Sequence, residues 1–377
     1  MLHRYELIEP EIPFTHAFAE FAASPADMEA YRFSMQSVRS WADQTLESEA
    51  TKTLFGSFAT FLGASPDDAG GAQLGWLFAL AEDLEAHGGE TRTNALVEKI
   101  SGDAKRATGV RLASGEEISA RELIVSNIDP GRLITDLLGA KMVGADIVDK
   151  MKLYEWGDSV FVMFVALESP INYKAGPAAR QSAHVHFTEP SLDFLSRVYL
   201  QCRGGALPSA PMMVSWNDSA IDPSRAPVGK ALMKFVVLSV PYVITGDASG
   251  KVPARTWDEA REPYADYLID LITDNYIPDL KAKILKRVAH SPVDISRRII
   301  SAVRGTLGQG AFLPYQSGSL RPIPELGQYK TPVPNVYLCS SGSHPGPGVS
   351  MAPGRNAAQV VFRDLGLDFR SVGSVRC

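Results

Sequence analysis

The chain has 377 residues, of which 45% are hydrophobic and 21% charged, and its formal net charge is −6. This composition is that of an ordinary globular protein, and the length allows a large core and about two domains. The acidic balance argues against a nucleic-acid partner. Cys202, Cys339 and Cys377 are odd in number and far apart, which argues against a disulfide framework and a structural zinc site.

The N-terminus and the apolar runs bear on localisation. Residues 1–10 carry charges where a signal peptide needs an apolar stretch. The longest apolar runs, 160–167 and 235–240, have the length of strands and are too short to span a membrane. We expect a cytoplasmic protein with no transmembrane segment, and a peripheral membrane contact stays open.

The first part of the chain is predicted to pass from helices to short strands and back to a helix. Aromatic residues recur at helical spacing before residue 62. Gly88-Gly89 is a stop signal for a helix and Asp129-Pro130 is a start signal. The expected elements are a mostly helical block over 13–62, a helix over 73–87, short strands with a hairpin over 89–126, and a helix over 129–138.

The middle of the chain is rich in strand patterns. β-Branched and aromatic residues form runs that are bounded by turn residues. The expected elements are strands at 159–167, 184–187, 212–216 and 232–240, loops at 170–181 and 223–227, a helix over 256–277 and a further helix over 278–288.

Residues 335–359 are the most informative segment. A strand over 336–339 runs into a loop that is rich in glycine, and a helix opens near Arg355. Backbone N–H groups at such a connection can meet a phosphate or an electron-rich ring, and glycine lets the main chain approach a ligand closely. Taken alone, the pattern also fits a tight strand-to-helix connection without a ligand.

The whole segment is far more specific than its glycines. It resembles the C-terminal FAD-binding segment of the phytoene desaturase-like flavoproteins, above all the branch called pyridine nucleotide-disulphide oxidoreductase domain-containing protein 2. The residues that carry the resemblance are Cys-Ser-Ser-Gly-Ser-His-Pro-Gly-Pro-Gly-Val-Ser-Met-Ala-Pro-Gly-Arg-Asn-Ala-Ala, from 339 to 358. Shorter matches lie at 88–97, 123–130, 222–229, 291–298 and 320–322.

The resemblance implies an α/β protein (α+β overall) with an incomplete Rossmann-like FAD-binding domain and a mixed-sheet and helical substrate domain. It implies the domain order helical cap segment 1–70, FAD-binding domain 71–140, substrate domain 141–300 and FAD-binding domain 301–377. It also implies an NAD(P)/FAD-dependent oxidoreductase of the dehydrogenase or desaturase type. The cofactor would be FAD, and the substrate a small apolar or mixed compound that gives up hydride from a C–C or C–N bond.

The cofactor-binding residues follow from the same resemblance. They are Val97, Ser126, Asn127, Gly342, Ser343, His344, Pro345, Gly346, Gly348, Val349, Ser350 and Met351. His344 is expected to hold the loop by hydrogen bonds rather than to act as an acid or base. Arg321 either reaches the cofactor or an acidic group, or it lies on the surface. No catalytic side chain is assigned.

Other polar and aromatic residues lack a complete catalytic or metal-binding pattern. His184 and His186 share one strand face, but no nearby Cys or Asp completes a metal set, so no metal is expected. With Trp216 and Asn217 they either line a pocket or pack on the sheet. The absence of a Gly-x-Ser-x-Gly elbow leaves a hydrolase without support.

Several departures from the family pattern leave two hypotheses open. The sequence contains no Gly-x-Gly-x-x-Gly turn, and Ser340, Pro347 and Met351 stand where many relatives have glycine. The chain is therefore an FAD-dependent oxidoreductase, or the C-terminal subunit or fragment of one, acting with a polypeptide that carries the N-terminal βαβ unit or as a homo-oligomer. The alternative is a non-catalytic remnant or scaffolding subunit without a competent flavin site. The first strand of that βαβ unit would be central in the sheet. Without it, the strands near Val97 and Val336 should have an unpaired edge.

Overall fold

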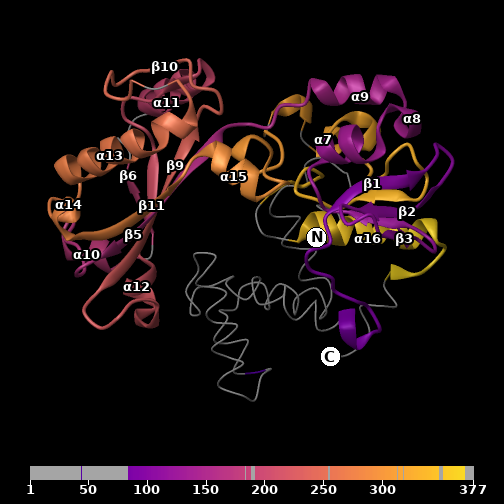
Figure 1. Ribbon diagram of the computed structural model, residues 1–377, viewed down its shortest axis with the longest axis horizontal. Coiled ribbons are helices and arrows are strands. Elements are labelled where there is room, and N and C mark those ends of the chain that lie inside the picture. Colours follow the sequence, from indigo (N-terminus) through magenta and orange to yellow (C-terminus); the bar gives the residue numbers. More distant parts are fainter. Residues whose placement is uncertain are drawn as a thin grey trace, which may run out of the picture. The chain divides into compact units, whose positions relative to one another are not determined.

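A computed structural model describes residues 44, 84–182, 184–187, 192–253, 255–311, 313–316, 318–347 and 351–369. The described residues divide into two compact units (Figure 1). The first unit contains residues 84–157 and those after 307, and the second contains residues 158–307. The helical block expected over 13–62, and with it the expected cap segment, lies outside the described residues except for Gln44.

The strands of the first unit form two small sheets. An antiparallel sheet has the order β1-β2-β3, with β1 at Val97–Gly102, β2 at Ala107–Leu112 and β3 at Glu117–Ser119. This confirms the predicted hairpin. A parallel pair joins β4, Ile124–Ser126, to β12, Val336–Leu338.

One asparagine ties these two sheets together. Asn335, just before β12, accepts a hydrogen bond from the Ala107 N–H at 2.8 Å and donates to the Ala107 carbonyl at 2.9 Å. It also donates to the Glu122 carbonyl at 3.1 Å. The start of β12 is thereby fixed against the hairpin and against the residues that lead into β4.

The first helical run of the first unit begins and ends at capping residues that the sequence predicts. The Asp129 side chain accepts from the Arg132 N–H at 3.1 Å, and Gly139 ends the run with φ at 70°, which confirms the helix predicted over 129–138. The run is α-helical only at α7, Pro130–Arg132, and continues as the π-helix η1, Leu133–Leu138. The other elements are α8 at Ala140–Val143, α9 at Ala145–Lys152, α16 at Ala352–Asp364, and the 3₁₀ turns η4 at Pro314–Gln316, η5 at Gly318–Leu320 and η6 at Pro324–Leu326.

The apolar core of the first unit explains where the compact units change. Leu133 and Ile134 of η1 pack with Met142 of α8, Met151 of α9 and Leu338 of β12. Helices α8 and α9 therefore belong to the first unit. The units change at 157/158 and 307/308, later than the domain limits of 140/141 and 300/301 expected from the sequence.

The second unit is built on a five-stranded sheet in the order β11-β5-β9-β8-β6 (Figure 1). All neighbours in it are antiparallel. The expected mixed sheet is thus wrong for this sheet, and parallel pairing in the unit is confined, among the described residues, to β7, Ala206–Leu207, and β10, Gly246–Asp247. The strands are β5 at Ser159–Leu167, β6 at His184–Phe187, β8 at Met213–Trp216, β9 at Ala231–Val240 and β11 at Ile284–His290.

Four of these five strands were predicted and one was predicted as a helix. The helix expected over 278–288 is wrong beyond α14, Leu280–Lys283, because the chain continues as β11. Val288 of β11 pairs with Phe164 of β5, and Ala289 with Met163. The backbone hydrogen bonds that the edge of β5 offers decide the conformation of this segment against its local helical pattern.

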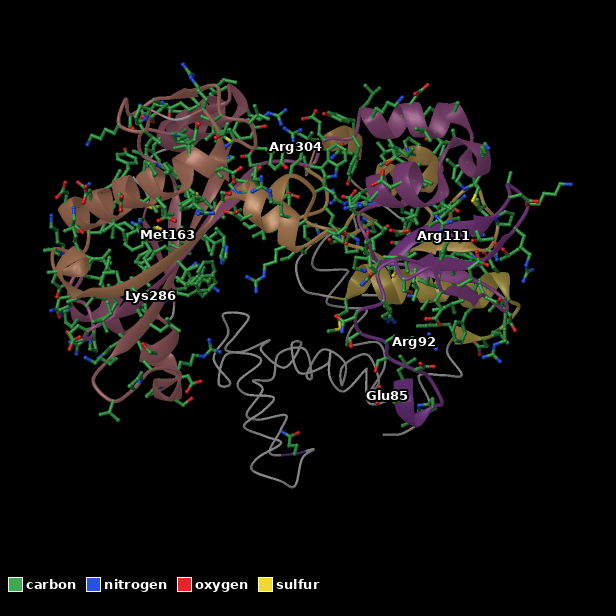
Figure 2. The ribbon with its side chains drawn as sticks, in the orientation of Figure 1. Glu85, Arg92, Arg111, Met163, Lys286 and Arg304 are labelled. Atoms are coloured by element: carbon green, nitrogen blue, oxygen red, sulfur yellow. The ribbon has the colours of Figure 1, made fainter. Side chains whose placement is uncertain are left out.

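The helix predicted over 256–277 is confirmed as α13, Trp257–Asn275, with Thr256 as its N-cap. Its buried residues Tyr264 and Leu268 pack on Phe161 and Met163 of β5, so that α13 covers one face of the sheet (Figure 2 labels Met163). The loop expected over 170–181 instead ends in a short helix, α10, Pro177–Gln181. The remaining elements are α11 at Leu192–Arg203, which was not predicted, α12 at Asp218–Ile221, η2 at Pro223–Arg225, α15 at Pro292–Arg298 and η3 at Val303–Gly305.

Candidate functional site

The candidate site lies where the two parallel strands of the first unit end. Val336, Tyr337 and Leu338 of β12 pair in register with Ile124, Val125 and Ser126 of β4. The carboxyl ends of both strands therefore lie at one edge, which is where ligands bind in open α/β sheets. Just beyond the strand ends, the Cys339 N–H donates to the Ser126 carbonyl at 2.9 Å. Residues 340–347, called the glycine loop below, follow directly.

The glycine loop packs on the start of α7. A Cβ added at Gly342 would overlap the ring of Pro130, so this position requires glycine because of close approach rather than because of its backbone angles. Pro130 is held by its neighbour Asp129, which is fully buried and caps α7. The loop after β12 and the loop after β4 are therefore packed together at the strand ends.

Hydrogen bonds within the glycine loop shape its first turn. The Ser343 N–H donates to the Ser340 carbonyl at 2.9 Å, and the Gly342 N–H donates to the Ser340 hydroxyl at 3.2 Å. Ser340, one of the three departures from glycine, thus closes the turn with its own side chain. Ser343 is 1% exposed, and its hydroxyl has no hydrogen-bond partner among the residues that the structure describes. A buried hydroxyl without a partner is costly and marks the loop as an incomplete environment.

Tyr329 ties the later part of the loop to α16. Its hydroxyl donates to the His344 carbonyl at 2.9 Å and accepts from the Asn356 side-chain amide at 2.9 Å. Burial raises the pKa of Tyr329 to about 12, so the hydroxyl keeps its proton and its donor role at neutral pH. The loop is held at His344 through the main chain, which leaves the role of the imidazole a prediction.

Arg321 lies buried beneath the loop. Its side chain is fully enclosed, at 1% exposure, so the surface role considered for it is wrong. The guanidinium donates to main-chain carbonyls at 3.0 to 3.1 Å, namely those of Gly308, Gly310, Ala311 and Ser341. The Ser341 hydroxyl in turn donates to the Gln309 side chain at 2.9 Å. One arginine thereby joins the glycine loop to the segment 308–311.

A second buried polar group stands behind α7. Asp129 accepts from the indole N–H of Trp156 at 2.9 Å in addition to capping the helix. Burial raises the pKa of Asp129 to about 6, and its hydrogen bonds oppose that rise. Tyr154, two residues before the tryptophan, donates to the Gln309 carbonyl at 2.7 Å. Sequence reasoning found Asp129 only as a helix start and missed both aromatic partners, because their contacts are distant in the chain.

The structure brings several of the predicted cofactor residues together and leaves others apart. Ser126, Gly342, Ser343, His344, Pro345 and Gly346 all lie at the joint strand ends. Asn127 is exposed there, and its side chain forms no hydrogen bond with any residue that the structure describes. Val97 opens β1 opposite Leu112, in the antiparallel sheet rather than in the parallel pair that leads into the loop.

The remaining predicted residues lie at the helix start. Met351 is the N-cap of α16 with a left-handed φ of 56° and makes no side-chain cap hydrogen bond. Gly348, Val349 and Ser350 lie outside the described residues. Helix α16 starts at Ala352, three positions before the predicted start at Arg355, because Pro353 fits the first turn of a helix.

The histidine pair of the second unit packs as an aromatic stack. The rings of His184 and His186 are 4.7 Å apart, and His184 also stacks on Trp216 at 4.6 Å. The Lys234 ammonium lies 4.5 Å from the centre of the Trp216 ring. Among the described residues, no group of three His, Cys, Asp or Glu side chains could hold a metal ion.

The comparisons with known proteins place the chain in a family. No family model matches the sequence. The pyridine nucleotide-disulfide oxidoreductase domain-containing protein 2 of Rattus norvegicus is 32% identical over 296 residues, which cover 76% of this chain and 49% of that protein. A lycopene-forming phytoene desaturase of Paracoccus sp. is 28% identical over 290 residues, covering 75% of this chain and 52% of the desaturase. This chain belongs to the phytoene desaturase-like family of FAD-dependent oxidoreductases.

Another family member and a more distant structure also match. A neurosporene-forming phytoene desaturase of Rhodobacter capsulatus is 28% identical over 291 residues, covering 75% of this chain and 51% of the desaturase. The chain spans about half the length of these curated relatives. Cyclohexylamine oxidase of Brevibacterium oxydans superposes with a TM-score of 0.43 and 15% identity, covering 94% of this chain and 77% of the oxidase. None of the helices in the described residues is long and apolar enough to cross a membrane.

Proposed function

We propose that this chain forms the C-terminal part of an FAD site and serves an FAD-dependent dehydrogenase or desaturase. Bound FAD would supply the chemistry, by accepting hydride from a C–C or C–N bond of the substrate. The residues of this chain would hold and orient the cofactor. Family membership supports the reaction class, and the geometry of the strand ends supports the site.

The observation that carries the proposal is the glycine loop at the joint ends of β4 and β12. The buried Ser343 hydroxyl lacks a partner among the described residues there, and Gly342 makes a contact that no larger residue could make. The exposed Asn127 amide adds a donor and an acceptor on the neighbouring loop. These features fit a polar ligand such as FAD, because most buried hydroxyls in proteins have a hydrogen-bond partner.

The N-terminus of α16 adds favourable electrostatics next to the loop. The helix has 13 residues, and its N-cap residue, Met351, provides no side-chain acceptor. The N-terminal end of an α-helix carries partial positive charge, which stabilises a nearby phosphate or other anion. The Tyr329–Asn356 hydrogen bonds would keep this helix end and the loop in a fixed relation.

An open strand edge in the first unit favours the proposal that another polypeptide completes the site. Strand β12 has a neighbour on both sides, because Leu338 donates to the Tyr329 carbonyl at 2.8 Å on the side away from β4. Within the described part of the chain β4 has no second neighbour, and Val125 on it is 46% exposed. An open edge of this kind invites another strand. We propose that a polypeptide carrying the N-terminal βαβ unit pairs here, and a second copy of this chain is the other candidate.

The second unit offers a surface for an apolar or mixed substrate. On the face of its sheet away from α13, Phe164 is 39% exposed and its cross-strand neighbour Val288 is 44% exposed. Lys234 pairs with Phe164 on the other side and lies over the Trp216 ring. An exposed apolar patch with a neighbouring cation fits a mostly apolar compound.

The alternative function is that of a scaffolding remnant without a competent flavin site. The lack of a Gly-x-Gly-x-x-Gly turn favours it, as does Pro347, which removes one N–H from the loop. Ser340 does not favour it, because its hydroxyl completes the turn that the loop needs. The two functions differ in one measurable property, which is the retention of flavin.

The visible absorption spectrum after incubation with FAD and desalting tests the proposal. It is recorded for the chain alone and for the chain co-expressed with a polypeptide that carries the βαβ unit. Flavin bands in the chain alone would mean that its own residues suffice, and bands only with the partner would establish a split site. The absence of bands in both preparations would exclude the oxidoreductase and leave the scaffolding function.

Two glycine substitutions show whether the bound flavin uses the glycine loop. Gly342→Ala would force the loop away from Pro130, so we expect flavin affinity to fall by about tenfold or more. Gly246→Ala in the second unit is the control, since a Cβ there meets only the Ala206 Cβ at 3.8 Å, an ordinary van der Waals contact. Both variants are checked for folding by circular dichroism. Equal flavin affinity in the two variants would contradict a site at this loop.

A further inference from the structure

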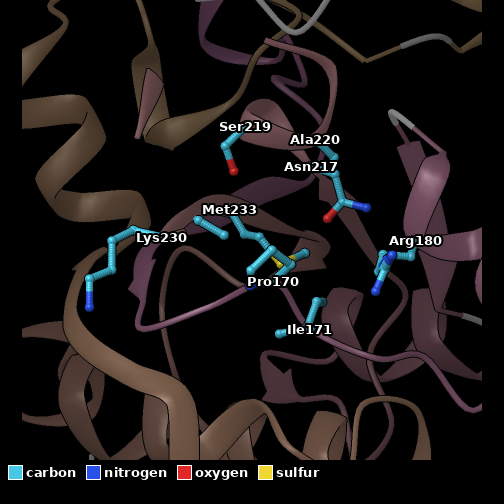
Figure 3. A pocket seen from close by; sticks show the side chains of 9 residues that line it. Pro170, Ile171, Arg180, Asn217, Ser219, Ala220, Lys230 and Met233 are labelled. Carbon is cyan, nitrogen blue, oxygen red and sulfur yellow. The ribbon is translucent and has the colours of Figure 1, made fainter. Parts of the chain in front are cut away.

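The second unit contains a cavity that is separate from the strand ends of the first unit. Water can reach about 60 Å³ of it, and it holds about 340 Å³ of empty space when the open solvent at its mouth is included. It lies at the start of β9, between the end of β8 and helix α10. Figure 3 shows Arg180 and Lys230 on opposite sides of an apolar patch that Pro170 and Met233 form.

The floor of the cavity is apolar and well buried. Ile171 and Met233 line it, with exposures of 2% and 1%. These side chains belong to the same core that packs under α13. The floor is therefore fixed by surrounding packing, and the apolar surface that it presents to the cavity is small.

The polar lining of the cavity has one sign of charge. Two basic side chains, Arg180 and Lys230, line it, and no acidic side chain among the described residues does. Lys230 forms an ion pair with Glu168. Arg180 at the end of α10 has no ion-pair partner among the residues that the structure describes. The lining thus leaves the positive charge of Arg180 available to a ligand.

A buried amide lies between these groups and the floor. Asn217 is 5% exposed, accepts from the Tyr173 hydroxyl at 3.2 Å and donates to the Ser182 carbonyl at 3.0 Å. A carboxamide has two N–H groups, and the Ser182 carbonyl uses one of them. The network with Tyr173 fixes the direction of the amide, so that the second N–H can serve an acceptor in the cavity.

We propose that this cavity binds a small carboxylate with a short apolar body. The carboxylate would accept hydrogen bonds from Arg180 and from the second N–H of Asn217, and the apolar body would cover Ile171 and Met233. Arginine suits a carboxylate because its N–H groups form a fork that matches the two oxygens. This site does not depend on the flavin proposal, since every residue in it belongs to the second unit.

The test uses three probes with the same tail and different head groups, namely hexanoate, 1-hexanol and hexylammonium. The protein carries ¹³C-labelled methionine methyl groups, and the Met233 signal is assigned by Met233→Leu. Hexanoate should shift the Met233 signal in a saturable way, 1-hexanol should bind about five- to tenfold more weakly, and hexylammonium should cause no shift. Equal affinity for the three probes, or no shift of Met233 with hexanoate, would overturn the proposal.

Two variants and one competitor identify the charge that is used. Arg180→Met should weaken hexanoate binding by about five- to tenfold and leave 1-hexanol unchanged. Lys286→Met is the control, because Lys286 is an exposed cation of the same unit that does not line the cavity (Figure 2). Inorganic phosphate should not displace hexanoate, because it has no apolar body. Displacement by phosphate, or equal effects of the two variants, would show a nonspecific anion effect and contradict the proposed site.

Discussion

Each of the two units of this protein is stabilised by a different kind of buried group. In the second unit, the face of the five-stranded sheet that meets α13 is lined by apolar residues such as Phe161, Met163 and Leu268. In the first unit, the parallel strands have three residues each, and the fully buried groups include Asp129 and Arg321. Apolar packing builds the larger sheet, whereas hydrogen bonds between distant loops shape the candidate cofactor site.

This contrast has a physical reason. A long strand with alternating apolar residues can bury a continuous face, and its backbone is satisfied by its neighbours. The backbone N–H and C=O groups of a ligand-binding loop cannot all pair with neighbouring strands, because some of them must stay open toward the ligand. Buried side chains such as Arg321 and Tyr329 then supply the hydrogen bonds that hold it. The stability of the second unit should follow apolar burial, and that of the first should follow completeness of hydrogen bonding.

The largest effect is expected from a cavity in the second unit. Phe161 is fully buried, with its ring 5.1 Å from that of Tyr264 and 5.7 Å from that of Trp257. Phe161→Ala should lower the free energy of unfolding by about 3–5 kcal/mol. Phe164→Ala, on the same strand but on the half-exposed face, should cost about 1 kcal/mol. Urea denaturation measures both, and equal costs would mean that the α13 face is not the dominant core.

A buried cation in the first unit should matter nearly as much as that aromatic ring. Arg321→Met would leave several buried carbonyls without donors, at a cost of about 3 kcal/mol. Arg297→Met removes an exposed ion pair with Asp258 and should destabilise the protein far less, because water screens such pairs. Denaturation monitored by tryptophan fluorescence compares the two. If they cost the same, the polar interior does not hold the first unit.

An effect about as large as that of Arg321→Met is expected in the pH dependence of the first unit. Because burial raises the pKa of Asp129 to about 6 from a reference of 3.8, the folded protein binds its proton more tightly than the unfolded chain does. The protonated carboxyl thus favours folding at low pH, and this contribution is lost as the pH rises from about 4 to about 6. It amounts to about 3 kcal/mol over the whole window, the ordinary value per unit of pKa being about 1.36 kcal/mol.

Asp129→Asn isolates this contribution, since asparagine can still cap α7 but does not titrate in this range. The difference in unfolding free energy between wild type and variant should shift against the wild type between about pH 4 and pH 6, and stay level above about pH 7. Denaturation curves at each pH measure it. A difference that is independent of pH would show that Asp129 is ionised throughout, with its hydrogen bonds from Trp156 and the α7 backbone outweighing its burial.

Local patterns in the sequence determined the elements whose causes are themselves local. The apolar runs of β5 and β9, the Thr256 cap of α13, and the Asp129 and Gly139 limits of the first helical run are all legible within a few residues. The glycine-rich segment before α16 likewise carried the family resemblance that the comparisons support.

Tertiary structure decided the features that depend on distant partners. Residues 284–290 are a strand because β5 offers them an edge, and Arg321 is buried because carbonyls from two separate loops surround it. The meeting of Ser126 with the glycine loop depends on the parallel pairing of β4 with β12, which no local pattern encodes. Hydrogen bonds and burial between segments far apart in the chain set these outcomes, and residue-by-residue preference is too weak to oppose them.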